Sequence, residues 1–281
     1  MSRILVTISL LFTVLIIKAQ KDTLLELKSN NTISIAHNNI KKHQINNKTL
    51  LTLPFLDDFS QYNHYPNQNL WQDFNAYINS SFPIDPHTYG VATFDGLDST
   101  GSPYVFTSTA YGIADYLTSI PIGLTTVVDS VFLSFYYQPQ GNGNKPETKD
   151  SIRVEFLRKR DTTWVRQWSA IGSPTQPFQK VMLHVDTSFQ HDAFQFRFLN
   201  YASLSGNVDH WNIDYVYLND NRNSADTALN DVSFITNNYG LLNEYSSMPW
   251  QHYLTDTIGL MDSTMSVTYK NNHSLDYAIF Y

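Results

Sequence analysis

The residues from 193 to 218 constrain the fold more than any other part of this sequence. Residues 193–198 alternate three phenylalanines with polar side chains, which is the period of a half-buried β-strand. Residues 211–218 repeat the alternation, with Trp, Ile and two Tyr on one predicted face. The polar, glycine-containing residues 200–210 between them are too many for a tight hairpin. The pattern predicts two long strands of a β-sandwich.

Composition also favours strands over helices. Aromatic residues make up 14% of the 281 residues, with 18 Tyr and 17 Phe against 5 Met. Aromatic side chains are enriched in strands. The formal net charge is −7, and the sequence has no basic stripe that would neutralise phosphates. We therefore expect an all-β protein with no nucleic-acid partner.

The N-terminus has the organisation of a secretory signal peptide over residues 1–20. Arg3 precedes an apolar run at 4–17, and a short processing motif follows at 18–20. A transmembrane anchor is the alternative, but about 14 apolar residues fall short of the roughly 20 that span a bilayer. No later segment is apolar enough to do so. We expect a secreted or cell-surface protein, exterior to the outer membrane, and, since cysteine is missing, one without disulfides.

Composition and turn signals divide the rest of the chain. Residues 21–50, rich in Asn, Lys and Gln, are expected to form a flexible leader. Residues 51–220 contain roughly eight strand patterns at short spacing, which is typical of a jelly-roll β-sandwich. Within them, 111–118 is expected to form a short helix or turn. A linker at 221–229 then leads to a partial second β unit of Ig-like type at 230–281, which is short for an independent sandwich.

Four motifs carry a resemblance to a known group of proteins. They are FLDDF at 55–59, GVATFDGLD at 90–98, NYASLSG at 200–206 and HWNID at 210–214. Together they resemble the first ordered domain of large bacterial surface proteins exported by the type IX, gliding-associated secretion route. The resemblance implies a MAM-like or concanavalin-like jelly roll. The chain departs from it in having no cysteine, and in having no recognisable sorting domain in its last part.

The resemblance further implies a structural Ca²⁺ ion where the first and last strands of the jelly roll meet. The candidate ligands are Asp57, Asp58 and Asp214, because Ca²⁺ prefers clustered oxygen ligands. Asp57 and Asp58 are neighbours in a strand and point to opposite faces, so at most one can share a face with Asp214. The alternative is that these carboxylates cap turns or accept backbone N–H groups.

Aromatic residues in or near the predicted loops suggest a ligand-binding surface. Trp71, Tyr89, Tyr104 and Trp164 are candidates for stacking on sugar rings. The alternative is that these side chains pack the core of the sandwich.

No catalytic constellation is recognisable in the sequence. Asp209 and His210 lack a nucleophile for a triad, and residues 150–155 carry acids only at their ends, unlike the active strand of laminarinase-like glycosidases. Zinc, phosphate-loop and dinucleotide motifs are missing too. We therefore predict a non-enzymatic exported surface protein whose jelly roll serves adhesion or assembly, with surface proteins or glycans as partners. The alternative is a carbohydrate-binding module of a polysaccharide-handling surface protein.

Overall fold

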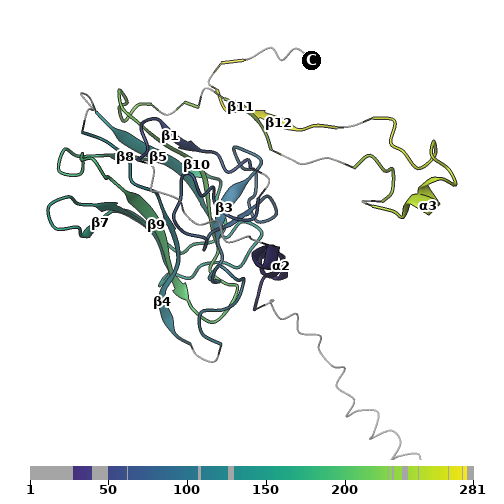
Figure 1. Ribbon diagram of the computed structural model, residues 1–281, viewed down its shortest axis with the longest axis horizontal. Helices are drawn as coiled ribbons and strands as arrows, with labels where there is room; N and C mark the ends of the chain where they lie inside the picture. Colours follow the sequence, from purple (N-terminus) through teal and green to yellow (C-terminus); the bar gives the residue numbers. More distant parts are fainter. Residues whose placement is uncertain are drawn as a thin grey trace, which may run out of the picture.

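Two antiparallel β-sheets packed face to face form the body of the protein (Figure 1). The computed structural model describes residues 28–39, 50–61, 63–106, 109–125, 130–226, 228–229, 231–235, 240–245, 247–264, 266–273 and 275–276. The predicted signal peptide lies outside these residues. The larger sheet has the order β2-β3-β10-β5-β8, with β1 also paired to β10. The smaller sheet has the order β4-β9-β6-β7. The all-β sandwich prediction is confirmed.

The strands of the larger sheet are β1 (Phe55–Asp57), β2 (Tyr77–Asn79), β3 (Val91–Phe94), β5 (Phe132–Pro139), β8 (Gln179–His184) and β10 (Trp211–Asn219). Those of the smaller sheet are β4 (Tyr111–Thr118), β6 (Ser151–Leu157), β7 (Trp164–Ile171) and β9 (Phe196–Ser203). The two alternating stretches that dominate the sequence thus lie in opposite sheets, because β9 and β10 do not pair with each other. The loop between them crosses from one sheet to the other.

A β-bulge interrupts β10. The register with β5 shifts near Tyr215, which has a φ of 51°. Trp211 and Ile213 are buried before the bulge, and Val216 and Leu218 are buried after it. The prediction that both tyrosines share a face with Trp211 is therefore wrong, because the extra residue reverses the alternation.

The bulge lies where two short strands meet along the same edge of β10. Strand β3 pairs with residues 211–213 and strand β1 with residues 216–218. Neither ladder includes Asp214, and its side chain hydrogen-bonds to His87 and Thr88 in the loop that precedes β3. This meeting point positions the first candidate site.

Aromatic side chains fill much of the space between the sheets. Phe194, two residues before β9, and Phe196 and Phe198, within it, have no exposed surface. Trp71 is also fully buried, and its ring meets those of Phe55 and Phe196 edge to face at centroid distances of 5.1 and 5.6 Å. Each such pair contributes about 0.5–1.5 kcal/mol beyond the buried area. The predicted inward face of residues 193–198 is confirmed.

Residues 111–118 form a strand, and the expected helix or turn is wrong. This segment, β4, pairs with β9 from Tyr111 to Thr118, with a bulge between Ile113 and Tyr116. Ala114 and Leu117 are buried. Cross-strand pairing along an edge of the smaller sheet outweighs the weak local preference of this sequence.

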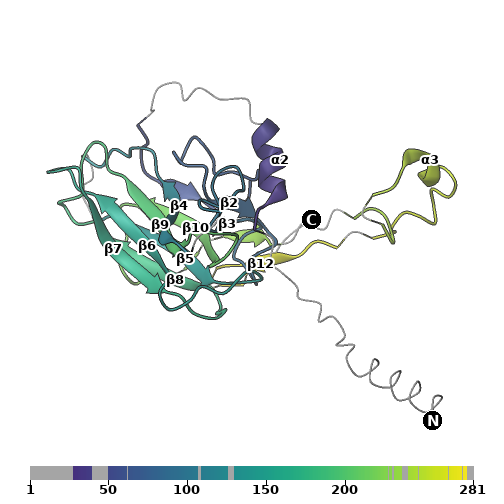
Figure 2. The ribbon, with the colours of Figure 1, turned by 90° about the horizontal axis from the view of Figure 1, so that it is seen from below.

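Part of the expected flexible leader is ordered. Helix α2 (Asn31–Asn39) lies beside β2 and β3 (Figure 2). The backbone N–H of Asn30 donates to the carbonyl of Gly101 at 2.8 Å, and Ile33 is 3% exposed. Asn30 also caps the helix, since its Oδ1 accepts from the N–H groups of Thr32 and Ile33. One buried isoleucine and its cap anchor a segment whose composition is otherwise polar.

A small two-stranded sheet, β11 (Val232–Phe234) with β12 (Tyr269–Asn271), follows the sandwich, and helix α3 (Trp250–Tyr253) lies between its strands in sequence. After Leu229, no hydrophobic side chain of the described residues is buried. Most of the strand expected at the end of the chain lies outside the described residues. No helix in the part that the structure describes is long and apolar enough to cross a bilayer.

Candidate functional site

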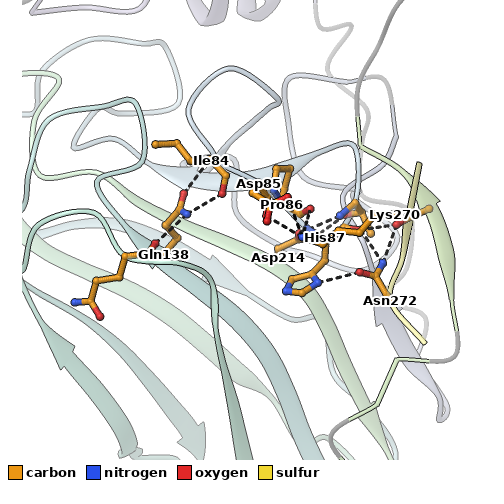
Figure 3. Close-up of polar contacts among 11 residues, drawn as sticks. Ile84, Asp85, Pro86, His87, Gln138, Asp214, Lys270 and Asn272 are labelled. Atoms are coloured by element: carbon orange, nitrogen blue, oxygen red, sulfur yellow. Dashed lines mark hydrogen bonds and ion pairs between the residues drawn. The ribbon is translucent and has the colours of Figure 1, made fainter. Parts of the chain in front are cut away.

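Asp214 is fully enclosed at the bulge of β10. Its Oδ2 accepts from the backbone N–H groups of His87 at 2.8 Å and Thr88 at 3.2 Å, and its Oδ1 accepts from Thr88 Oγ1 at 2.7 Å. Figure 3 shows Asp214 facing the loop of His87. Burial raises the pKa of the Asp214 carboxyl to about 7, against the opposing effect of these hydrogen bonds. The carboxylate is therefore held in place but has no cationic side chain beside it in the described structure.

Asp57 and Asp58 diverge, as strand alternation predicts. Asp57 points into the core, where its Oδ2 accepts from Trp71 Nε1 at 2.6 Å. Burial raises the pKa of Asp57 to about 6, although the hydrogen bond from Trp71 lowers it. The Asp58 side chain accepts from the N–H and hydroxyl of Ser60 in a local turn. Asp58 thus caps a turn, as the alternative interpretation of these carboxylates expects, and Asp57 accepts a hydrogen bond inside the core. Neither side chain contacts Asp214.

The backbone of Asp58, however, meets Asp214 through Thr88. The Thr88 hydroxyl lies 2.6 Å from the Asp58 carbonyl, 3.2 Å from the Gly90 carbonyl and 2.7 Å from Asp214 Oδ1. A hydroxyl has one proton, so it can donate to only one of these three oxygens. We call these four groups the Thr88 oxygen cluster. Converging oxygens of this kind suit a hard cation such as Ca²⁺.

Carbonyl and hydroxyl oxygens dominate this cluster. No group of three or more His, Cys, Asp or Glu side chains that could hold a metal is present among the described residues. A cation here would be held by the Asp214 carboxylate, the Thr88 hydroxyl and two backbone carbonyls. Sequence reasoning found Asp214 but missed Thr88, because a threonine between loop and strand belongs to no metal-binding motif.

The loop at 84–88 is held from two sides (Figure 3). Gln138, on β5, accepts from the N–H of Ile84 and donates to its carbonyl, both at 2.9 Å. On the other side, Asn272 Nδ2 donates to the His87 carbonyl at 2.8 Å and Lys270 Nζ to the Asp85 carbonyl at 3.2 Å. The loop that supplies Thr88 therefore also receives the small β11–β12 sheet.

The four predicted ligand-binding aromatics lie in different places. Trp71 has no exposed surface, so it packs the core and cannot line a groove. Tyr89 borders a surface pocket of about 460 Å³ beside β2. The hydroxyl of Tyr104 donates to Asp115 Oδ1 at 3.1 Å in the interior. Trp164 lies on the outer face of the smaller sheet, so these side chains do not form one binding surface.

The outer face of the smaller sheet gathers arginine and aromatic side chains. The register of its four strands places one set of residues on the side that points away from the core. All of them are partly or fully exposed. We call this surface the arginine face, and its members are Tyr111, Tyr116, Arg153, Glu155, Trp164, Arg166, Arg197 and Tyr201.

Cations lie over the rings of this face. The Arg197 guanidinium is 4.2 Å from the centroid of Trp164 and 5.4 Å from that of Tyr116. Arg153 lies 5.0 Å from the ring of Tyr201. Arg197 is also paired with Glu155, at 2.7 Å between Nη2 and Oε2. The stacking and the ion pair fix the positions of the arginines on the outer face of the sheet.

His210, which invited a catalytic interpretation, has a structural role. It is 2% exposed, and its Nδ1 accepts from the backbone N–H of Asn144 at 2.9 Å. Burial lowers the pKa of its imidazole to about 4. The neighbouring Asp209 accepts from the N–H of Ser203 at 3.0 Å and does not orient the imidazole. A neutral, enclosed histidine of this kind positions the loop at 140–144.

No family model and no curated protein matches this chain. Among solved structures, a cleaved adhesin domain of Lys-gingipain from Porphyromonas gingivalis aligns with 60% of this chain and 99% of its own, at 10% identity and a TM-score of 0.37. A carbohydrate-binding module specific for non-crystalline cellulose aligns with 55% of this chain and 90% of its own, at 13% identity and a TM-score of 0.34. A xylan-binding domain from Paenibacillus barcinonensis aligns with 60% of this chain and 95% of its own, at 8% identity and a TM-score of 0.34. The strand pairing of the protein itself defines its class, a two-sheet β-sandwich with a small additional sheet. Structural similarities as distant as these do not identify a ligand.

Proposed function

We propose that this chain is a non-catalytic recognition module of an exported surface protein, and that the arginine face is its binding surface. The observation that carries the proposal is the set of stacked cations and aromatic rings on the outer side of the smaller sheet. Arginine, tyrosine and tryptophan are the residues that most often dominate binding energy at recognition surfaces. Here they are fixed on strands, where their geometry is better defined than on loops.

Glycans are the partner that this face suits best. The tyrosine hydroxyls and the arginine donors together offer hydrogen bonds to sugar hydroxyls over an extended surface. A strand-built surface accommodates an extended chain more readily than a compact one. This favours the carbohydrate-binding alternative over adhesion to a protein.

The test is binding of the purified chain to a glycan array, followed by titration of the best ligand. Trp164→Ala removes the ring beneath Arg197, and we expect it to weaken binding about two- to fivefold, since a cation–π contact at an exposed site contributes about 0.5–1 kcal/mol to holding the guanidinium in place. Tyr89→Ala, in the separate pocket beside β2, is the matched control and should bind as the unaltered protein does. Equal affinities of both variants, or no binding to any glycan, would contradict the proposal.

Assembly with another protein is a second candidate function, favoured by the C-terminal unit. Trp250 is 67% exposed, Ile258 88% and Phe234 63%, although large apolar side chains usually avoid water. We expect the chain to associate through these residues, either with a second copy of itself or with another surface protein. Trp250→Ser with Ile258→Ser should abolish that association in light scattering, and a monomer before and after substitution would contradict it.

The proposal has two further parts, export of the protein from the cell and binding of a structural Ca²⁺ ion. The N-terminal sequence supports cleavage after residue 20 and, with the motif resemblance, export by the type IX route. N-terminal sequencing of the protein recovered from cells tests the cleavage. The Thr88 oxygen cluster supports a structural Ca²⁺ ion, with Asp214 as its carboxylate ligand and the Asp58 carbonyl beside it.

A further inference from the structure

The rings of the arginine face are not free to stack on a sugar. Arg197 covers Trp164 and Tyr116, and Arg153 covers Tyr201. At the edge of the sheet, Lys149 Nζ lies 3.8 Å from the ring centroid of Tyr111. The groups that a ligand meets first are therefore cationic, and the rings act as supports for them.

Two arginines on this face form no salt bridge with a carboxylate of the described residues. Arg153 makes one hydrogen bond among the described residues, from Nε to Ser151 Oγ at 3.0 Å, which leaves both terminal nitrogens as donors. Arg166 is exposed and belongs to no salt bridge of the described chain. By contrast, Arg197 is neutralised by Glu155. A planar guanidinium with free terminal nitrogens matches a carboxylate in bidentate geometry.

The two free arginines are spaced along the face. Arg153 pairs with Ser169 across the β6–β7 ladder, whereas Arg166 pairs with Glu155. They are thus one strand and two residues apart, a diagonal of about 8 Å between Cα positions. Two separate anionic groups can be bound at once at this spacing.

The charge of the whole chain limits how densely charged the ligand can be. The face carries Arg153, Arg166 and Arg197 against Glu155, whereas the chain as a whole has a formal net charge of −7. A local excess of positive charge on an acidic protein attracts an anionic ligand at short range. A polyanion as densely charged as a nucleic-acid duplex, with one charge per about 1.7 Å of its length, would be repelled by the rest of the surface.

We propose that the arginine face recognises an acidic polysaccharide, whose carboxylate groups lie further apart than the phosphates of a nucleic-acid duplex. This inference rests on the proposed function and adds the chemical class of the ligand. Arg153 and Arg166 bind one carboxylate each, and Tyr201 holds Arg153 in position. Arg197, on the neighbouring strand β9 and paired with Glu155, lies beside them and contributes less to affinity.

The experiment is isothermal titration calorimetry of the full chain with polygalacturonate and with its fully methyl-esterified form, in which every carboxylate is replaced by an uncharged methyl ester. We expect binding to polygalacturonate that weakens as salt is added, and at least about tenfold weaker binding to the ester. Arg153→Gln and Arg166→Gln should each weaken polygalacturonate binding about tenfold. Arg160→Gln, an exposed arginine in the turn outside this face, is the control and should bind normally.

The outcomes separate the two proposals. Equal binding to both polymers, with dependence on Trp164, would overturn the carboxylate inference and leave the glycan-binding proposal intact. Binding to neither polymer nor to any arrayed glycan would overturn both. Arginine-dependent binding to acidic peptides or nucleic acid alone would also overturn the polysaccharide assignment. Circular dichroism of the glutamine variants checks that they are folded, which is expected because Arg153 and Arg166 are partly or fully exposed.

Discussion

Replacing Asp214 with asparagine tests the proposed cation site most directly. The folded pKa of Asp214, about 7, lies above the usual 3.8, so protonation favours the folded state. Its stabilising effect is complete below about pH 4 and is lost as the pH rises through about 7. The rise in pKa corresponds to at most about 4 kcal/mol of unfolding free energy. Asparagine keeps an acceptor for the His87 and Thr88 N–H groups and carries no charge.

Without divalent cations, we therefore expect Asp214→Asn to be more stable than the unaltered protein at pH 7.5, by up to about 4 kcal/mol. The advantage should disappear at about pH 4. Ca²⁺ at one hundred times its Kd should narrow this difference to about 1 kcal/mol, because it adds about 2.7 kcal/mol to the protein that binds it and nothing to the variant.

The assay is urea unfolding followed by tryptophan fluorescence, at several pH values, in EDTA and in Ca²⁺. Asp192→Asn, at a side chain that is 70% exposed, serves as the control. The difference between variant and unaltered protein isolates Asp214 from the other buried carboxyls. Parallel pH profiles in EDTA would refute the burial argument, and an equal response of both proteins to Ca²⁺ would refute the cation site.

Three further substitutions test the packing. Trp71→Phe leaves the buried Asp57 Oδ2 without its donor and should lower the unfolding free energy by about 1–3 kcal/mol in urea titrations, and an unchanged midpoint would contradict this. Asn272→Ala removes two contacts to His87 and should speed proteolytic removal of the C-terminal unit without altering the melting of the sandwich. Gly141→Ala, at a φ of 61° and with its Cβ 2.2 Å from a backbone carbonyl, should lower the melting temperature by several degrees, and an unchanged temperature would count against the geometry.

The sheet architecture could be predicted because its signal is local. Alternation in residues 193–198 reports directly on a buried face, and all three of its phenylalanines are in the core. Alternation could not reveal the bulge at Tyr215, since an extra residue in a strand looks like a change of period. Nor could it reveal β4, whose pairing with β9 is a long-range contact. Helix α2 was missed because a single buried side chain, Ile33, anchors a polar segment.

The candidate sites were harder to predict because they depend on backbone and on register. Asp214 was identified from its strand, but its partners are a threonine hydroxyl and two backbone N–H groups, which carry no sequence signature. The arginine face needs the pairing of four strands before its members can be seen as neighbours. Of its residues, Trp164 alone was among the predicted ligand-binding residues. Trp71 was misjudged because a tryptophan in a loop-rich region has the same sequence context whether it lies inside or outside.

The position of β1 on the edge of β10 has a mechanical consequence for a protein exposed to tension. Phe55 pairs with Leu218 and Asp57 with Val216, so the chain before β1 and the chain after β10 leave from the same end of this ladder. A pulling force applied between them opens the hydrogen bonds one after another instead of shearing them together. Asp58 follows β1 directly, and its carbonyl meets Asp214 through Thr88. A cation bound there would resist the separation of β1 from β10, because it would link the residue after β1 to Asp214 in the middle of β10.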